Sequence, residues 1–217
     1  MLLQNQNSPY IDLTFPLSGE NLPLDNGYLV YAALSRICPI IHDLQHISIH
    51  PIAGIPEPPK ALRLISRSKL IIRLPIDQIP LLYSLGGQSF TIGKNQYQLG
   101  FPEPKTLQPV SGLYSRLVII RRYQEPQAFL KEAQRQLKQL KIQGTITFLT
   151  RADGEPQCRQ LTIKNQSGIF QLKGFGLRVS ELSDEDSMTL QQFGIGGKHK
   201  MMVGVFLPTR RNLKEQE

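Results

Sequence analysis

The chain has 217 residues, of which 40% are hydrophobic, and its formal net charge is +8 at pH 7. This hydrophobic content is sufficient for a folded core and excludes wholesale disorder, and no apolar run approaches the roughly 20 residues of a membrane span. The N-terminus MLLQNQNSPY has no basic region followed by a long apolar region, which predicts no signal peptide, no membrane contact and a cytoplasmic location.

The first half of the chain is predicted to alternate between strands and helices in one fixed order. The order is strand, helix, strand, strand, helix, strand, which is the ferredoxin-like pattern. The first helix is expected to start after Asp25 as its cap and to stop near Pro39. The expected ranges are a strand at 10–15, a helix at 27–37, a strand at 46–52, two strands around a tight turn within 62–75, a helix at 77–85 and a hairpin at 90–101.

The second half repeats this order after the proline-rich stretch FPEPKTLQP, which we predict to be a linker. We therefore expect an α+β fold of two tandem ferredoxin-like (RRM-like) domains, with the glycine-rich loop in the second domain. The expected domains are residues 1–105 and 106–217. The expected ranges are strands at 113–123, 144–150, 158–163 and 168–180, helices at 125–142 and 184–193, and a final strand at 201–208.

Most of the excess basic charge belongs to the predicted second domain. Residues 1–105 contain 8 Lys and Arg against 7 Asp and Glu, whereas the remainder contains 17 against 10. Such an excess favours a polyanionic partner, with a soluble basic protein of no special partner as the alternative. The two cysteines, Cys38 and Cys158, lack the spacing of metal ligands, and we expect both to be reduced.

The predicted helix at 125–142 has an apolar face and an opposite basic face. Only Glu132 lies among its basic residues to offset their charge. Together with the strand before it, this helix predicts a surface that tracks phosphates, although a solvated helix face is the alternative. The basic residues of this surface are Arg116, Arg121, Arg122, Lys131, Arg135 and Lys138.

Three of the four histidines, His42, His46 and His50, lie within nine residues. Spacings of four would suit a metal site on a helix, but the stretch HISIHPI alternates like a strand. His46 and His50 are then expected to share a face, with His42 in the preceding loop and only Asp43 as an acidic neighbour. We predict no metal site and no cofactor. A loop histidine suits general acid–base chemistry, although each histidine alone could be structural.

The stretch GIGGKHKMMVG near the C-terminus combines glycines with basic residues. It precedes an expected strand and lacks the GK[ST] ending of a Walker loop, so it is neither a nucleotide-binding nor a dinucleotide-binding motif. A bulged hairpin is one interpretation. Its basic centre instead predicts a contact with an anion, made by Gly194, Gly196, Gly197, Lys198, His199 and Lys200.

These features resemble the CRISPR-associated repeat-processing endoribonucleases (the Cas six family). The family's hallmark near the C-terminus is G-hydrophobic-G, five residues, then G-hydrophobic-G. Gly194–Gly196 match the first half, and Met202-Val203-Gly204 match the second with Met202 in place of a glycine. The segment LPLDNGYLVYAALSRICPIIHD resembles the family's first helix, with Tyr31 inside it and His42 just past its end. HPIAG and the short length resemble the compact myxobacterial and cyanobacterial subtype, in which a histidine often stands where this chain has Asn26.

The resemblance implies metal-independent cleavage of CRISPR repeat RNA (pre-crRNA) to guide RNA. The ribose 2′-hydroxyl attacks the phosphate and leaves 2′,3′-cyclic phosphate and 5′-hydroxyl ends. It implies His42 as general acid or base, Tyr31 as the residue that positions the 2′-hydroxyl or assists proton transfer, and His46 as the reserve. The partners would be a repeat RNA stem-loop, held by the basic helix and the glycine loop, and other subunits of a Cascade-type effector. A non-cleaving subunit that holds the guide RNA stem and an unrelated tandem ferredoxin-like module are the alternatives.

Overall fold

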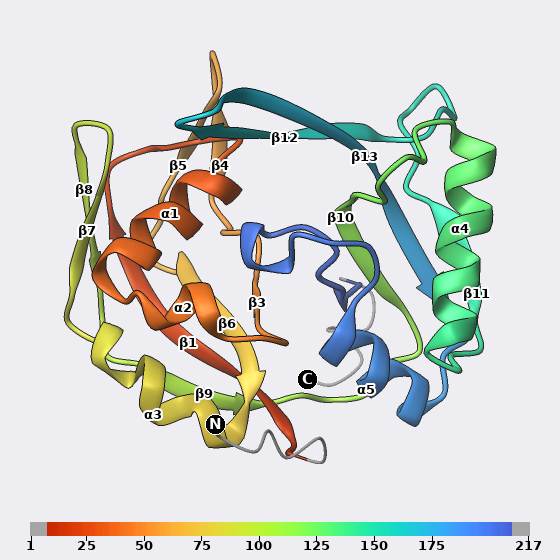
Figure 1. Cartoon of the computed structure of the whole chain (residues 1–217), viewed down its shortest axis with the longest axis horizontal. Helices are drawn as coiled ribbons and strands as arrows, with labels where there is room; N and C mark the ends of the chain where they lie inside the picture. The colour runs from red at the N-terminus through yellow and green to blue at the C-terminus, as the bar shows by residue number, and fades with distance from the viewer. Residues whose placement is uncertain (1–7, 210–217) are drawn as a thin grey trace. The chain divides into compact units, whose positions relative to one another are not determined.

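The structure is a computed structural model and describes residues 8–209. The chain separates into two compact units, Met1–Leu107 and Gln108–Glu217 (Figure 1). Each unit is built around an antiparallel sheet with helices. None of the described helices is long and apolar enough to cross a membrane.

The first unit contains a main sheet with the strand order β3-β6-β1-β8-β7, in which β9 also pairs with β1, and a small sheet with the order β2-β5-β4. Its central strand β1 buries Leu13 and Phe15 completely, and α1 buries Val30 and Leu34 against the same unit. The elements are β1 (Tyr10–Gly19), β2 (Leu22–Pro23), α1 (Gly27–Ile37), α2 (Ile40–Asp43), β3 (Ser48–Ile49), β4 (Ile55–Glu57), β5 (Ala61–Arg63), β6 (Lys69–Pro75), η1 (Ile76–Gln78), α3 (Ile79–Leu82), η2 (Tyr83–Leu85), β7 (Ser89–Ile92), β8 (Asn95–Leu99) and β9 (Glu103–Thr106).

The predicted range of the first helix, 27–37, is observed as α1, but the predicted cap Asp25 was wrong because Asn26 occupies the N-cap position. Asn26 is buried, and its Nδ2 donates a 2.9 Å hydrogen bond to the Pro23 carbonyl instead of capping the helix. The loop predicted around His42 was also wrong, since this residue lies in the short helix α2. The strand predicted at 46–52 shrinks to Ser48–Ile49 because only these two residues pair with β6.

The structure shows strand partners that the sequence pattern did not specify. The two strands predicted around a tight turn within 62–75 are present as β5 and β6, but they belong to different sheets. Ser68 holds the turn between them, since its Oγ donates to the Ala53 carbonyl at 2.7 Å and accepts from the Ile65 amide at 3.0 Å. The predicted linker contains β9, which pairs with β1 despite Pro104, as an edge strand allows.

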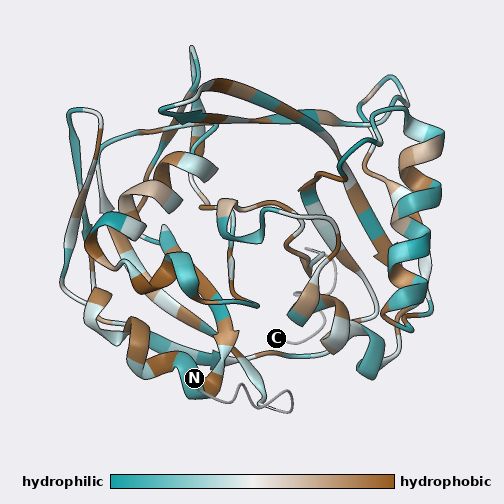
Figure 2. Cartoon of the chain, in the orientation of Figure 1, coloured by the Kyte–Doolittle hydropathy of each residue, from teal (hydrophilic) through white to brown (hydrophobic). Residues whose placement is uncertain are grey.

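The second unit has the strand order β11-β13-β10-β14, with β12 paired to the first half of β13. The helices α4 and α5 pack on one face of this sheet, where Phe129, Leu137 and Leu190 meet Phe175 and Leu177. Figure 2 shows hydrophobic and hydrophilic residues alternating along α4, as its amphipathic sequence predicts. The elements are β10 (Leu113–Val118), α4 (Pro126–Gln139), β11 (Thr145–Phe148), β12 (Cys158–Asn165), β13 (Gly168–Ser180), α5 (Asp184–Phe193), η3 (His199–Met201) and β14 (Leu207–Pro208).

Two strands of the second unit, β10 and β14, are shorter than the sequence predicted. β10 ends at Val118, so Arg121 and Arg122 lie in a turn, where Arg122 has a φ of +72°. The final strand is only Leu207–Pro208. Residues 202–206 are buried, as their apolar character requires, but glycine-loop contacts replace strand pairing there.

Candidate functional site

Tyr31 and His42 form a hydrogen-bonded pair in the first unit. The Tyr31 Oη and His42 Nδ1 lie 2.8 Å apart, with the two ring centroids 6.5 Å apart. The chain reverses at Cys38 and Pro39, which allows α2 to return beside α1. The fully buried Ile41 anchors α2 and leaves the neighbouring His42 exposed. The pair therefore presents an exposed imidazole that the Tyr31 hydroxyl contacts at Nδ1.

In both useful charge states of the ring, Nδ1–H can donate to Tyr31. In the neutral ring Nε2 then has a lone pair and can accept a proton. In the imidazolium Nε2 carries a proton and can give it away. The arrangement thus suits either half of general acid–base catalysis near neutral pH.

The other two histidines of the cluster have different environments. His46 is exposed, with a φ of +59°, in the loop between α2 and β3. His50 is buried beside the sheet, so the prediction that His46 and His50 share a strand face was wrong. The cause is that β3 ends at Ile49 and does not extend back to His46. The described residues contain no group of three His, Cys, Asp or Glu side chains arranged to hold a metal ion.

A buried polar network that the sequence did not reveal surrounds His50. Asp12 and Arg73 are directly paired across β1 and β6, with a 2.7 Å bond from Arg73 Nε to Asp12 Oδ1 and a 2.9 Å bond from Arg73 Nη2 to Oδ2. His50 Nε2 lies 3.4 Å from Asp12 Oδ1, and it has no hydrogen-bond partner among the described residues. Burial alone would raise the pKa of Asp12, but His50 and Arg73 outweigh it and hold this pKa well below its usual range. Burial and then the charge of Arg73 lower the pKa of His50.

We expect Asp12→Asn to lower the free energy of unfolding by about 3 kcal/mol at pH 7, because it leaves Arg73 buried without its counter-charge. The pKa of Asp12 is lowered in the folded state, so its stabilisation is present above the unfolded pKa of about 3.9 and is lost as pH falls below it. Urea unfolding at several pH values should therefore show that the difference in free energy of unfolding between wild type and variant becomes smaller below about pH 4.

The control is Asp153→Asn, which removes an exposed pair with Arg151 and should change stability by less than about 0.5 kcal/mol. If the difference in free energy of unfolding between wild type and Asp12→Asn were the same at pH 7 and below about pH 4, this account would be contradicted.

Backbone hydrogen bonds hold the glycine loop (residues 194–204) against the chain that follows β10. The Gly204 amide donates to the Leu117 carbonyl at 2.8 Å, and the Gly197 amide donates to the Ile119 carbonyl at 3.1 Å. The Gly196 amide donates to Oε1 of Gln136 on α4 at 2.8 Å. Gln136 was missed by the sequence analysis, since nothing in the sequence marks a helix glutamine as a loop anchor.

Three glycines of this loop, Gly194, Gly196 and Gly204, have positive φ angles of 58°, 76° and 68°. An added Cβ at Gly204 would lie 2.3 Å from the Ile195 carbonyl oxygen and 2.8 Å from the His199 ring. Gly197 differs, since nothing lies within 4 Å of the position of its Cβ. The loop thus requires glycine at three positions and tolerates a side chain at the fourth.

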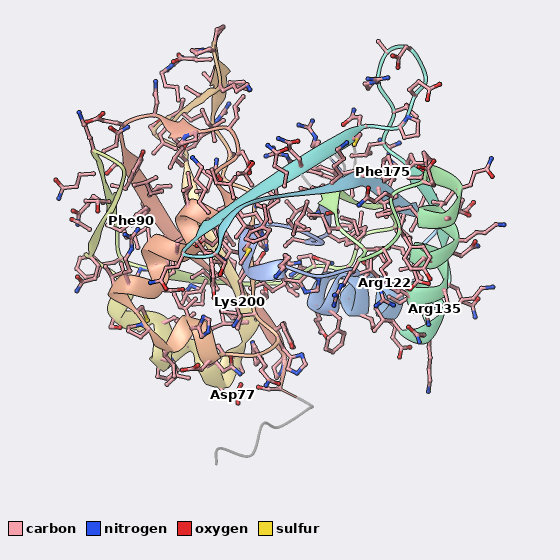
Figure 3. The ribbon with its side chains drawn as sticks, turned by 45° about the horizontal axis from the view of Figure 1, so that its top comes forward. Asp77, Phe90, Arg122, Arg135, Phe175 and Lys200 are labelled. Carbon is pink, nitrogen blue, oxygen red and sulfur yellow. The ribbon has the colours of Figure 1, made fainter. Side chains whose placement is uncertain are left out.

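The basic residues of the loop occupy different environments. Lys198 is exposed and left-handed at φ +70°, while Lys200, labelled in Figure 3, is half-buried. The His199 ring fills the space beside Gly194 and Gly204, and its Nε2 lies 3.4 Å from the Ile195 carbonyl oxygen. Burial lowers the pKa of His199, which favours the neutral ring. His199 therefore fits a role in holding the loop together.

The helix α4 presents Lys131, Arg135 and Lys138 on its exposed face, as predicted from the sequence spacing. Arg135, labelled on this helix in Figure 3, pairs with Glu132 and donates hydrogen bonds of 2.8 Å from Nε and 2.6 Å from Nη2 to its carboxylate. Hydrogen bonds from Arg135 and from Gln136 lower the pKa of Glu132 to about 2. The net charge of this face is therefore carried by the two lysines.

The predicted basic surface is not continuous. Arg121 lies in the turn that leads into α4, whereas Arg116 lies on β10 beside Tyr114 and Arg159. Tyr114 pairs in register with Arg178, which alternates with the core residues Leu177 and Val179 and so faces away from the helices. The structure thus separates Arg116 from the basic face of α4.

The comparisons with known proteins agree with this architecture. The family model described as Cas6 Crispr matches residues 11–211. The chain belongs to the Cas6 family. It is 31% identical over 207 residues to a CRISPR-associated endonuclease Cas6 from Myxococcus xanthus (strain DK1622), a match that covers 95% of this chain and 85% of that protein.

Solved structures of Cas6 and RAMP proteins share the fold. A CRISPR associated protein Cas6 matches with a TM-score of 0.62 at 10% identity, covering 94% of this chain and all of that one. A RAMP protein described as binding different RNA substrates matches with a TM-score of 0.65 at 15% identity, covering 90% of this chain and 98% of that one. The predictions of a Cas6 family member and of a tandem ferredoxin-like α+β fold are confirmed.

The Cas6 glycine motif keeps its backbone shape where the sequence departs from it. Met202, which stands at a motif glycine, has a φ of +64° and a ψ of 24°, in the left-handed region that glycine favours. A non-glycine residue costs roughly 1–2 kcal/mol in this conformation. The Met202 side chain is only 8% exposed, and burying a methionine returns a similar amount of free energy.

Proposed function

We propose that this chain is an endoribonuclease that cleaves CRISPR repeat RNA, without a metal ion, to produce guide RNA. The observation that carries the proposal is the 2.8 Å contact between Tyr31 and His42 in a chain of the Cas6 family. The related endonuclease from Myxococcus xanthus supports it, since 95% of this chain is covered by that match.

The substrate supplies its own nucleophile, so the protein need only orient the RNA and move protons. The 2′-oxygen forms a bond to phosphorus, the bond from phosphorus to the 5′-oxygen breaks, and the 2′-hydroxyl proton leaves. The products carry a 2′,3′-cyclic phosphate and a 5′-hydroxyl. His42, through Nε2, takes the 2′-hydroxyl proton or protonates the 5′-oxygen. Tyr31 holds the imidazole through Nδ1, and His46 is the reserve candidate for the proton transfer.

The RNA is held as a stem-loop by the basic face of α4 and by the glycine loop. Lys131 and Lys138 are the exposed cations of that face without an ion pair among the described residues, and they contact stem phosphates. The amide-rich backbone at 194–200, with the exposed Lys198, lies against the RNA backbone. We further propose a cytoplasmic location and association with other subunits of a Cascade-type complex.

The test incubates purified protein with end-labelled repeat RNA from its own CRISPR array in EDTA. The expected result is a single cut whose upstream product ends in a 2′,3′-cyclic phosphate, so that poly(A) polymerase extends its 3′ end only after this phosphate has been removed. Cutting that appears only when a divalent cation is restored would overturn metal independence. Tight binding with no cut would favour the second candidate, a non-cleaving subunit that retains the guide RNA stem.

We expect Tyr31→Phe to slow cleavage by roughly tenfold, because it removes the hydrogen bond that orients His42 but leaves the ring in place. Single-turnover cleavage rates measured across pH check this, since a lost imidazole partner should also move the pH profile. Tyr28→Phe on the same helix is the matched control and should cut at the wild-type rate. An unchanged rate and profile for Tyr31→Phe would remove Tyr31 from the site.

A further inference from the structure

The face of the second unit's sheet that is turned away from α4 and α5 carries a second set of arginines. Arg178 points to this face because its neighbours Leu177 and Val179 are fully buried in the core. Its register partners on this face are Tyr114 of β10 and Thr147 of β11. This face is built from several strands, so its side chains have fixed positions relative to one another.

Two more arginines lie on the same face. Arg159 on β12 pairs in register with Gly174, four residues along β13 from Arg178, which is roughly 13 Å. Arg116 on β10 and Arg159 on β12 lie near the same part of β13, since Val118 of β10 and Cys158 of β12 both pair in register with Phe175. Desolvation and then the charge of Arg159 lower the pKa of Arg116. All three arginines are exposed. Gly174 and Gly176 between them are buried, because Leu117 and Ile119 pack beside Gly174 and Leu149 packs beside Gly176.

The charge of these arginines is uncompensated, in contrast to other arginines of the chain. Arg73 pairs with Asp12, and Arg151 pairs with Asp153. Within residues 8–209, Arg116, Arg159 and Arg178 form no ion pair and no side-chain hydrogen bond with a carboxylate. Like charges held close together attract an anion that spans them.

We propose that Arg116, Arg159 and Arg178 form a second RNA-binding site, which takes the phosphates of single-stranded RNA rather than the stem. The spread of the guanidiniums over three strands fits several phosphates in a row, and the half-exposed Tyr114 beside them can stack on a base. An acidic protein surface is the alternative partner. The inference rests on the proposed function for its ligand, and it names the part of the substrate that the stem-binding surface leaves uncovered.

The test measures binding of an unstructured RNA of about 15 nucleotides, a length in the range that one such module covers. We compare the wild type with the triple variant Arg116→Gln, Arg159→Gln, Arg178→Gln at several salt concentrations. Each phosphate contact contributes about 0.7 to the slope of log affinity against log salt for a single strand. The triple variant should therefore bind about tenfold or more weakly, with a slope smaller by about two.

Three further proteins make the result specific. Arg151→Gln removes an exposed but paired arginine and should bind the RNA like the wild type. The triple lysine variant keeps the charges and should keep the salt slope. Arg178→Gln alone, with a slope change of about 0.7, serves as the test if melting curves show that the triple variant is unfolded.

A triple glutamine variant with the wild-type affinity and slope would overturn the inference and leave an acidic protein partner for this face. Failure of the proposed function has a different signature, because it is the absence of cutting of repeat RNA by the wild type. Binding of the unstructured RNA is measured without cleavage, so either hypothesis can fail while the other survives.

Discussion

His42→Ala is expected to cut repeat RNA about 10² to 10⁴-fold more slowly than the wild type, while it binds the RNA with little change. The reason is that the proposed function assigns the proton transfer to His42, the exposed imidazole that Tyr31 contacts at Nδ1. Removing the ring should remove this proton transfer but not the proposed phosphate contacts, which involve other residues. Single-turnover rates with excess enzyme measure the chemical step apart from product release.

His46→Ala is the matched control for this prediction, because it removes an exposed histidine four residues away. It should cut within a few-fold of the wild type. The reverse pattern, with full activity in His42→Ala and loss in His46→Ala, would move the proton transfer to His46. Loss in neither variant would show that neither imidazole moves the proton.

Gly204→Ala is expected to lower the free energy of unfolding by about 3 kcal/mol. A left-handed conformation costs a non-glycine residue roughly 1–2 kcal/mol, and the φ of Gly204 is +68°. The new methyl group would also lie 2.3 Å from the Ile195 carbonyl oxygen, which forces the loop to move. The displaced loop should lose RNA affinity as well, since its Gly204 amide would leave the Leu117 carbonyl.

Gly197→Ala is the control within the same loop. Its Cβ would meet nothing within 4 Å, and its φ is not in the left-handed region. Thermal melting should therefore place Gly197→Ala within about 0.5 kcal/mol of the wild type. Equal melting temperatures for Gly204→Ala and Gly197→Ala would contradict the argument that this loop needs glycine for its backbone shape.

The amino-acid sequence by itself determined the order of elements and the family. Periodicity placed α1 and α4 nearly at their observed ends, because a helix that buries one face must repeat apolar residues every three to four positions. The glycine spacing at 194–204 identified the loop, because only glycine freely adopts the positive φ found there. These are local properties, and a local pattern can encode them.

Tertiary structure alone decided which polar groups meet. The sequence marked Tyr31 and His42 through the family resemblance, but the 2.8 Å contact depends on the return of α2 along α1. It showed Glu132 among the basic residues of α4 but not that Glu132 pairs with Arg135 in particular, and it gave no signal that Gln136 holds Gly196. Hydrogen bonds and ion pairs between side chains depend on distances of a few ångströms, which strand pairing and helix packing set.

Tertiary structure also decided which strands pair and which face of each sheet the helices cover. The sequence predicted two strands around a tight turn within 62–75 and grouped Arg116 with the basic surface of α4. Strand pairing placed β5 and β6 in different sheets and Arg116 on the face turned away from α4. A strand's alternation shows which residues share a face but not which face is covered by helices. That choice depends on packing in three dimensions, because the core forms where the largest apolar area can be buried.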